Sequence, residues 1–233
     1  MINHWIITSA LADSGCFSQE DKFHQTVLTI NSIRKYSPNN HIILVEGSNQ
    51  EITGIHRRTL VSMVDWYMDC HNLSEFKKLH NTEGRERQNL KSSLECFLVM
   101  EALRTKVAHW VQPSHRVYKI SGRYKLNQHY NFQTHVNQQH KWCFARMHAG
   151  IFMDYQRLGQ YPTRMYSFCG SLINQAQQTI NDIKTKLETD YEKGSWLDIE
   201  HAMFDHLSPQ MVHQVSPLGV EGLLSNCGTL VSD

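Results

Sequence analysis

Short, continuous apolar runs and longer stretches of helical periodicity alternate along the chain. The runs at 4–10 (HWIITSA) and 41–48 (HIILVEGS) are typical of parallel strands that are buried on both faces. Between them, apolar residues recur at helical spacing over 23–34, with Arg34 continuing the stripe, and SPNN at 37–40 predicts a turn. A strand, a helix and a strand in this order predict a right-handed βαβ unit.

The rest of the chain continues this alternation. Three further stretches have helical periodicity: 90–104, 172–187 and 196–207. Further strand-like runs lie at 57–64, 118–126, 142–147 and 167–173. Polar stretches predict a mobile loop at 71–89, an irregular segment at 127–141 and a loop-like tail at 217–228. The pattern predicts an α/β fold, with a central, mostly parallel sheet flanked by helices in a single domain over 1–233.

Composition narrows the class of protein. The 233 residues are 40% hydrophobic and 19% charged, with a formal net charge of +1, so no global field favours nucleic acid or a membrane surface. No apolar run approaches the length of a membrane span, and the N-terminus does not resemble a signal peptide. The six cysteines form no CxxC pair and match no zinc spacing. We therefore expect a cytoplasmic protein with reduced, mostly buried thiols, no integral membrane segment and no nucleic-acid partner.

Polar residues and glycines follow three of the predicted strands. The carboxyl ends of parallel strands share one rim of a sheet, which is where ligands bind in such folds. These ends are Ser9 with Ala10, Glu46 with Gly47, and Ser121 with Gly122 and Arg123. A glycine permits a sharp exit and a close backbone approach to a ligand, and an arginine supplies a permanent charge for an anion. The alternative is a simple bend with Arg123 solvated or in a salt bridge.

Several nucleotide-binding and hydrolase motifs are absent: GxxxxGK[ST], GxGxxG after the first strand, and GxSxG. The order and character of six segments instead resemble GT-A glycosyltransferases, the nucleotide-sugar-dependent class with one Rossmann-like domain. The segments are HWIITSAL, HIILVEG, LKSSLECFLVMEAL, YKISGRY, SFCGSLI and WLDIEHAMF. The chain resembles the small members of this class that are found in bacteria and their phages.

The resemblance implies an enzyme of the hexosyltransferase kind, which moves a sugar from a nucleotide-diphosphate donor to an acceptor hydroxyl. Its usual donor is a UDP-sugar. It implies a nucleotide-sugar-binding half at 1–125 and an acceptor-binding half at 126–233. The residues that it assigns to the donor are Thr8, Ser9, Ala10, Arg34, Glu46, Gly47, Arg85, Lys91, Ser121 and Gly122, with Arg123 facing the diphosphate. As alternatives, Glu46 caps a turn and the basic residues at 85–91 are only solvated.

The family's DxD motif, which holds a divalent cation against the diphosphate, is absent from the sequence. Ser121-Gly122-Arg123 occupies its place, so a requirement for Mn²⁺ or Mg²⁺ is left open. The diphosphate leaving group still needs positive charge as the glycosyl bond breaks. Arg123 is our candidate for that charge, with Lys119, Lys125 or the 85–91 segment as further sources.

Two acidic residues in the segment GSWLDIEHAMF complete the predicted site. Ser195 and Asp198 have the spacing of a capping box, so Asp198 favours the helix N-terminus. Glu200 falls about 40° from the centre of the apolar stripe and therefore points inward. In the resembled family an acid here serves as the base for the acceptor hydroxyl, a role that we assign to Glu200, with Asp198 second. A buried salt bridge is the alternative for Glu200.

Two other classes of protein remain open from the sequence. A non-catalytic nucleotide- or sugar-binding α/β module would have the same rim without a competent acid. A nucleic-acid-processing protein is disfavoured by the near-neutral charge. The sequence leaves the sugar, the acceptor, the oligomeric state and the choice between inversion and retention undecided.

Overall fold

The structure, a computed structural model, describes residues 2–13, 16–82, 88–148, 159–224 and 228–233. Its centre is a seven-stranded sheet with the strand order β3-β2-β1-β4-β7-β6-β8. The strands are β1 (Asn3–Ser9), β2 (Asn40–Glu46), β3 (Trp66–Asp69), β4 (Arg116–Ser121), β6 (Trp142–Ala145), β7 (Met165–Cys169) and β8 (Val212–Val215). All neighbouring pairs are parallel except the two that involve β7. The predicted α/β fold with a mostly parallel sheet is confirmed.

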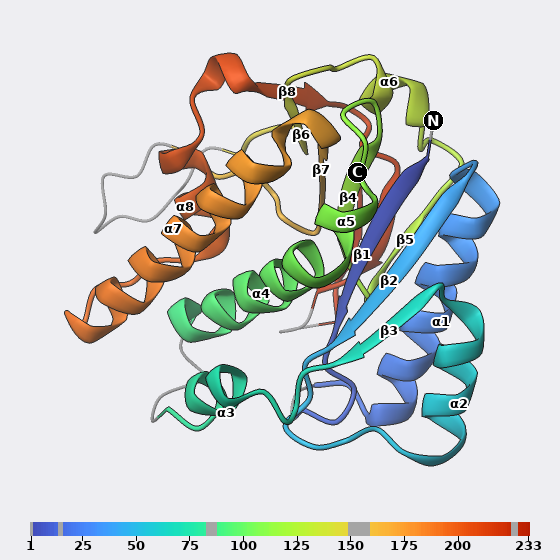
Figure 1. Cartoon of the computed structure of the whole chain (residues 1–233), viewed down its shortest axis with the longest axis vertical. Coiled ribbons are helices and arrows are strands. Elements are labelled where there is room, and N and C mark those ends of the chain that lie inside the picture. The colour runs from blue at the N-terminus through green and yellow to red at the C-terminus, as the bar shows by residue number, and fades with distance from the viewer. Residues whose placement is uncertain (1, 14–15, 83–87, 149–158, 225–227) are drawn as a thin grey trace.

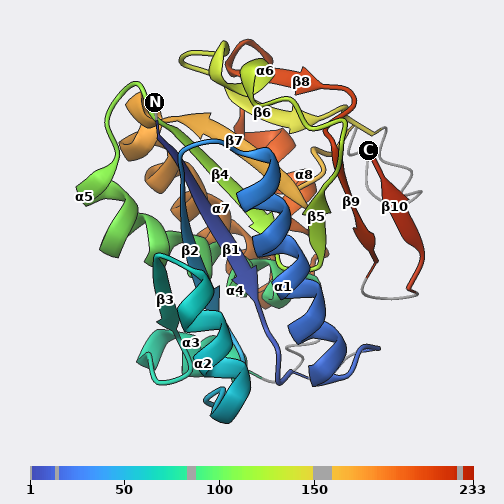
Figure 2. The same cartoon turned by 90° about the vertical axis from the view of Figure 1, so that its right-hand side faces the viewer.

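Helices cover both faces of this sheet (Figures 1 and 2). The helices α1 (Gln19–Tyr36) and α2 (Gly54–Met63) lie on one face. The other face carries α3 (Ser74–His80), α4 (Gln88–Ala102), α7 (Ile173–Glu192) and α8 (Ile199–His206). A π-helical turn at Leu103–Val107 leads from α4 into α5 (Ala108–Trp110), and α6 is Phe132–Val136.

The apolar runs of the strands feed two separate cores. On β1, the side chains of Trp5 and Ile7 belong to the core under α1, and the side chain of Ile6 belongs to the core under α4 and α7. Successive side chains of a strand point to opposite faces, so a strand buried on both faces needs apolar residues at every position. This requirement explains why the β1 and β2 runs are continuous rather than alternating.

A second sheet of three antiparallel strands lies beside α1. Its strands are β5 (Tyr124–Leu126), β9 (Val220–Leu223) and β10 (Leu230–Ser232). The Thr29 hydroxyl donates to the main-chain oxygen of Tyr124 over 2.7 Å, and the Leu126 amide donates to the Ser32 hydroxyl over 2.9 Å. These two bonds attach β5 to α1, so the chain that leaves β4 at Arg123 runs along this helix.

The structure corrects several predicted elements. The run at 57–64 lies mostly in α2, because His56, Leu60 and Met63 form a helical stripe toward the protein, and the strand β3 comes after it. The predicted loop at 71–89 contains α3, and the predicted irregular segment at 127–141 contains α6. The strand expected at 167–173 ends at Cys169, and the tail predicted to be a loop carries β9.

Two further expectations concern the cysteines and the membrane. Cys70, Cys96, Cys143 and Cys169 are buried free thiols, as predicted, Cys16 is exposed, and Cys227 lies outside the described residues. Over the part of the chain that the structure describes, none of the helices has the length and apolar character needed to cross a bilayer.

Buried histidines at the amino edge of the sheet predict a loss of stability in acid. The ring nitrogens His4 Nε2 and His115 Nδ1 lie 3.0 Å apart, and burial, with the nearby His115 and His41, lowers the pKa of His4 to about 4. As the pH falls, the unfolded chain therefore binds a proton on His4 at a higher pH than the folded chain does. The contribution of neutral His4 to the free energy of unfolding is fully present above a pH of about 6.5. It is lost as the pH falls toward 4, which lowers the free energy of unfolding by about 3 kcal/mol.

The measurement is the free energy of urea unfolding as a function of pH in this window. The variant His4→Gln should flatten the profile, although His135, whose pKa burial lowers to about 3, retains part of the slope. The exposed His109 gives a matched control, since His109→Gln should leave the profile unchanged. An equal slope in the wild-type chain and in His4→Gln would contradict the prediction.

Candidate active site

The carboxyl ends of four parallel strands lie side by side and form one edge of the sheet. In the register of the sheet, Ser9 at the end of β1 is opposite Glu46 at the end of β2, and Glu46 is opposite Asp69 at the end of β3. On the other side of β1, Thr8 is opposite Ser121 at the end of β4. We call this region the carboxyl edge. It brings together residues that are far apart in the sequence.

Main-chain hydrogen bonds continue this edge into the loops. The Gly47 amide donates to the Ser9 oxygen over 2.8 Å, and the Gly122 amide donates to the Thr8 oxygen over 2.9 Å. The three segments that we expected on one rim therefore meet there. A Cβ atom at Gly122 would lie 3.0 Å from the Thr26 hydroxyl oxygen, so this glycine allows the chain after β4 to pack closely against α1.

Glu46 fastens the loops after β1 and β2 to each other. Its side chain is fully buried, and its carboxylate accepts from the amides of Leu11 and Ser48, each over 3.0 Å, and from the hydroxyls of Ser9 and Ser48. Burial raises the pKa of Glu46, and these hydrogen bonds oppose the rise. Since all four donors come from the protein, Glu46 holds the edge in shape and does not present its carboxylate to a ligand.

The other predicted donor contacts differ in how much surface they present. Thr8 is buried, and a Cβ atom at Gly47 would meet the side chain of Leu98 at 2.6 Å, so both positions face protein. Ala10 and Ser121 are half-buried. Of these positions, Ala10 and Ser121 are therefore the ones that a bound molecule could touch without a rearrangement.

Two cationic side chains lie at the carboxyl edge. The nitrogen Nη1 of Arg123 is buried and has no hydrogen-bond partner among the described residues, and its guanidinium carbon lies 5.9 Å from the centre of the Tyr124 ring. Lys22, on α1, donates to the main-chain oxygen of Asp13. Burial lowers the pKa of Lys22, the carboxylates of Asp13 and Glu46 oppose this, and the charge of Arg123 adds to it. An anion placed here would satisfy the unpaired N–H of Arg123.

A buried lysine, Lys119, connects the carboxyl edge to the segment at Thr163 that contacts Glu200. The ammonium of Lys119 forms an ion pair with Glu95 on α4, and it donates to the Ser121 hydroxyl and to the main-chain oxygen of Thr163, each over 3.0 Å. The Ser121 amide in turn donates to the main-chain oxygen of Arg164 over 3.0 Å. Lys119 is therefore enclosed and paired, so it positions its neighbours and is not a spare charge for a leaving group.

Glu200 joins the network of Lys119 through Thr163. Its Oε1 atom accepts from the Thr163 amide over 3.0 Å, and Oε2 accepts no hydrogen bond from the described residues. Burial raises the pKa of Glu200, the Thr163 amide opposes this, the charge of Asp198 adds to it, and Arg164 opposes it. One oxygen is thus held in place and the other remains able to accept a proton. This is the arrangement that a general base requires.

Asp198 has a different position from Glu200. It is the N-cap of α8, where its carboxylate accepts from the amide of His201 over 2.9 Å and contacts the His201 ring nitrogen Nδ1 at 2.7 Å. The predicted capping box, which placed Ser195 at the cap, is wrong, because the helix begins at Ile199. Asp198 stabilises the first turn that carries Glu200.

Replacing Asp198 should reduce the stability of the fold more than it reduces the rate of the reaction. The variant Asp198→Ala removes the cap and one partner of the buried His201, so we expect the free energy of unfolding to fall by about 0.5–2 kcal/mol. Asn caps helices nearly as well as Asp, so Asp198→Asn should retain most of that stability. Urea denaturation of both variants measures the effect. Equal stability of wild type and Asp198→Ala would show that the cap is dispensable.

The three basic residues of the predicted donor set differ in where the structure places them. Arg34 lies in the last turn of α1 and pairs with Asp65, which precedes β3, at 3.0 Å, so it belongs to the amino edge, at the other end of the sheet from Ser9. Lys91 is exposed in the first turn of α4. Arg85 lies outside the described residues. The structure therefore does not bring Arg34 to the other predicted residues.

Asp69 and His71 were missed by the sequence reasoning. Asp69 Oδ1 contacts His71 Nδ1 at 2.7 Å, and Asp69 Oδ2 is buried and without a hydrogen-bond partner among the described residues. The sequence signal for this pair is its place at the end of a strand, but that strand was expected at 57–64, whereas β3 is Trp66–Asp69. Lys22 had a comparable signal, because the helix after the first strand begins at the carboxyl edge.

The described residues do not supply a metal site. No group of three or more His, Cys, Asp or Glu side chains within them could hold a metal ion. At the end of β4, where the resembled family carries its acidic motif, the described side chains are those of Ser121 and Arg123, and a guanidinium repels a cation. The side chains described at this position therefore do not fit a divalent cation.

Comparisons with known proteins are consistent with the geometry at the level of the fold. No protein-family model and no curated protein sequence matches the chain. A solved structure that matches it is the apo form of mouse xyloside xylosyltransferase 1, with a TM-score of 0.52 and 11% sequence identity, over 92% of this chain and 84% of that one. The chain has the fold of this glycosyltransferase. The narrower expectation of a small bacterial or phage type is not supported, since the neighbour is a mouse protein.

Proposed function

We propose that this protein is a glycosyltransferase that moves a sugar from a nucleoside diphosphate to an acceptor hydroxyl at the carboxyl edge. The observation that carries the proposal is that two groups with unsatisfied atoms are connected by one short network of hydrogen bonds. These are the unpaired guanidinium N–H of Arg123 and the free Oε2 of Glu200. Ser121, bonded to Arg164, and the Thr163 amide, bonded to Glu200, connect them.

In this proposal the diphosphate of the donor lies beside Arg123 and Lys22. The bond between the anomeric carbon and the diphosphate oxygen breaks, and its electron pair stays on the diphosphate. The acceptor oxygen bonds to the anomeric carbon, and its proton passes to Glu200. Fixed positive charge near the leaving oxygen stabilises the charge that develops there. Glu46 and Lys119, both buried, keep the edge and the Thr163 segment in position.

A thermal-shift screen tests donor binding. UDP, UDP-glucose, UDP-galactose and UDP-xylose are added in turn, with Mn²⁺ or with EDTA. UDP-xylose is included because the structural neighbour is a xylosyltransferase. A ligand at a hundred times its Kd stabilises the native state by about 2.7 kcal/mol, which raises the Tm by about 5–10 °C for a chain of this size. The Mn²⁺ and EDTA arms decide whether binding requires a metal.

The result also separates an enzyme from a binding module. An enzyme should release UDP from a UDP-sugar, by transfer or by slow hydrolysis, whereas a non-catalytic module would show the thermal shift without release. No shift with any of the four nucleotides in either arm would overturn the proposed function.

A further inference from the structure

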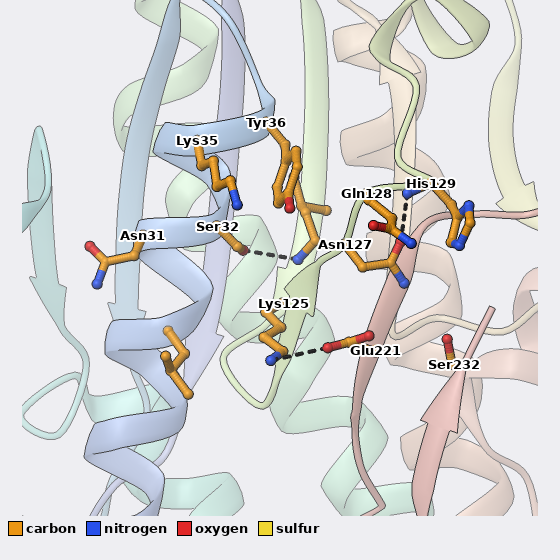
Figure 3. Close-up of a pocket in the computed structure, with 12 residues that line it drawn as sticks. Asn31, Ser32, Lys35, Tyr36, Lys125, Asn127, Gln128, His129, Glu221 and Ser232 are labelled. Carbon is orange, nitrogen blue, oxygen red and sulfur yellow. Dashed lines mark hydrogen bonds and ion pairs between the residues drawn. The ribbon is translucent and has the colours of Figure 1, made fainter.

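A groove separate from the carboxyl edge lies between the second half of α1 and the small sheet (Figure 3). Its volume of about 570 Å³ is within the roughly 300–1,000 Å³ range of small-molecule sites. One wall is α1, and the other consists of β5, the turn after it, and residues of β9 and β10. The hydrogen bonds that attach β5 to α1 fix the two walls relative to each other. We call it the β5 groove.

Polar side chains from both walls of the β5 groove have hydrogen-bonding groups that the described protein groups leave unused. Lys35 and Tyr36 lie on the α1 wall, and Asn127 and Gln128 lie on the opposite wall (Figure 3). Within the described part of the chain, the side chains of Lys35, Tyr36 and Gln128 make no hydrogen bond or ion pair, although Lys35 Nζ lies over the Tyr36 ring, 4.7 Å from its centre. Asn127 uses its carbonyl oxygen to accept from the His129 amide over 2.9 Å, which leaves its NH₂ group available.

The charge and polarity of the β5 groove limit the class of ligand. Lys125 pairs with Glu221 at 3.0 Å, so Lys35 is the uncompensated lysine among the lining residues. Leu28 and Leu126 are the aliphatic lining residues, too little for an apolar ligand. Side-chain amides both donate and accept, as neighbouring sugar hydroxyls do. The Tyr36 ring adds a flat surface with a polar end, and a sugar that stacks on it would also meet the ammonium of Lys35, which lies 4.7 Å from the ring centre.

We propose that the β5 groove binds a saccharide chain, namely the non-reacting part of the acceptor glycan, an assignment that rests on the proposed function. β5 begins directly after Arg123, so Lys125 in the groove is two residues from Arg123, or about 7 Å along the strand. A chain held in the groove keeps its other end close to the carboxyl edge, which raises the effective concentration of that end. The acceptor is then an oligosaccharide or polysaccharide.

Titration of the full-length chain by NMR tests this. Cellohexaose, xylohexaose, maltohexaose and chitohexaose are added separately at millimolar concentration while backbone amide shifts are followed. At least one should shift amides clustered at 28–36 and 125–129. Tyr36→Ala and Gln128→Ala should each weaken this binding by up to about tenfold. Gln178→Ala, which removes an exposed glutamine on α7, should have no effect.

The outcomes separate this proposal from the transferase proposal. No groove shifts with any of the four saccharides, or shifts with inorganic phosphate only, would overturn the saccharide site. A separate titration with UDP should shift amides at 8–10 and 121–123, which reports donor binding. Saccharide shifts without UDP shifts would leave the groove as a saccharide site and remove the proposed function. UDP shifts without saccharide shifts would do the reverse.

Discussion

The variant Glu200→Gln should reduce sugar transfer by about 10²–10⁴-fold, the usual contribution of a general base. The amide cannot accept the proton of the acceptor hydroxyl, although it retains the size of the side chain and can still accept from the Thr163 amide through its oxygen. The affinity for UDP should change little, because Glu200 contacts the segment at Thr163 and not the cations at Arg123 and Lys22. Single-turnover transfer and UDP titration measure the two effects separately.

The exposed Glu192 on α7 provides a matched control, since Glu192→Gln removes the same charge away from the site. Burial raises the pKa of Glu200, so the acid limb of the rate profile should lie above the ordinary range of a carboxyl group, and the rate should rise with pH through that limb. Loss of this limb in Glu200→Gln is expected. Wild-type turnover in Glu200→Gln would contradict the assignment of the base.

The meeting of the segments after β1, β2 and β4 could be predicted from the sequence for a simple reason. Parallel strands have their carboxyl ends at one edge, so polar residues that follow buried runs must gather there. Glu200 could be placed inward by helical phase, and in the structure it is half-buried with a partner. Both inferences use only the periodicity of a strand or a helix, which the local sequence determines.

Other parts of the site depend on direction and tertiary packing. The resemblance assigned Arg34 to the donor, but the helix after β1 runs back to the amino edge, so its last turn lies far from the carboxyl edge. Asp69 was missed because the run expected to be a strand, 57–64, lies mostly in α2, and the strand β3 comes only after this helix. The pairing of Lys119 with Glu95 joins β4 to α4, and no local pattern reports such a contact.

Glu46 shows how the same residue can be located correctly and given a different role. Its position at the edge follows from the strand pattern. Its full burial follows from four donors that come from two loops, and the sequence does not show that these loops fold over the carboxylate. In the proposed function the chemistry therefore falls to Arg123 and Glu200, two half-buried groups that retain unpaired atoms.

The variant Arg123→Gln should lower the rate of transfer by about 10²–10³-fold, as the loss of one preorganised donor does at a site of developing negative charge. The unpaired Nη1 atom leaves Arg123 with a hydrogen bond still to form at the carboxyl edge. Arg123→Lys should recover only part of the rate, because an ammonium keeps the charge but not the planar fork that matches a phosphate. Transfer assays with both variants, at saturating donor, measure this difference.

The exposed Arg58 on α2 gives the control, since Arg58→Gln removes the same charge from the surface without changing the carboxyl edge. A chelator arm distinguishes the guanidinium from a divalent cation as the source of stabilisation. If Arg123 stabilises the leaving group, turnover should depend on Arg123 whether or not EDTA is present. Full turnover in Arg123→Gln, together with complete inhibition by EDTA, would transfer that role from the arginine to a metal ion and would overturn this part of the mechanism.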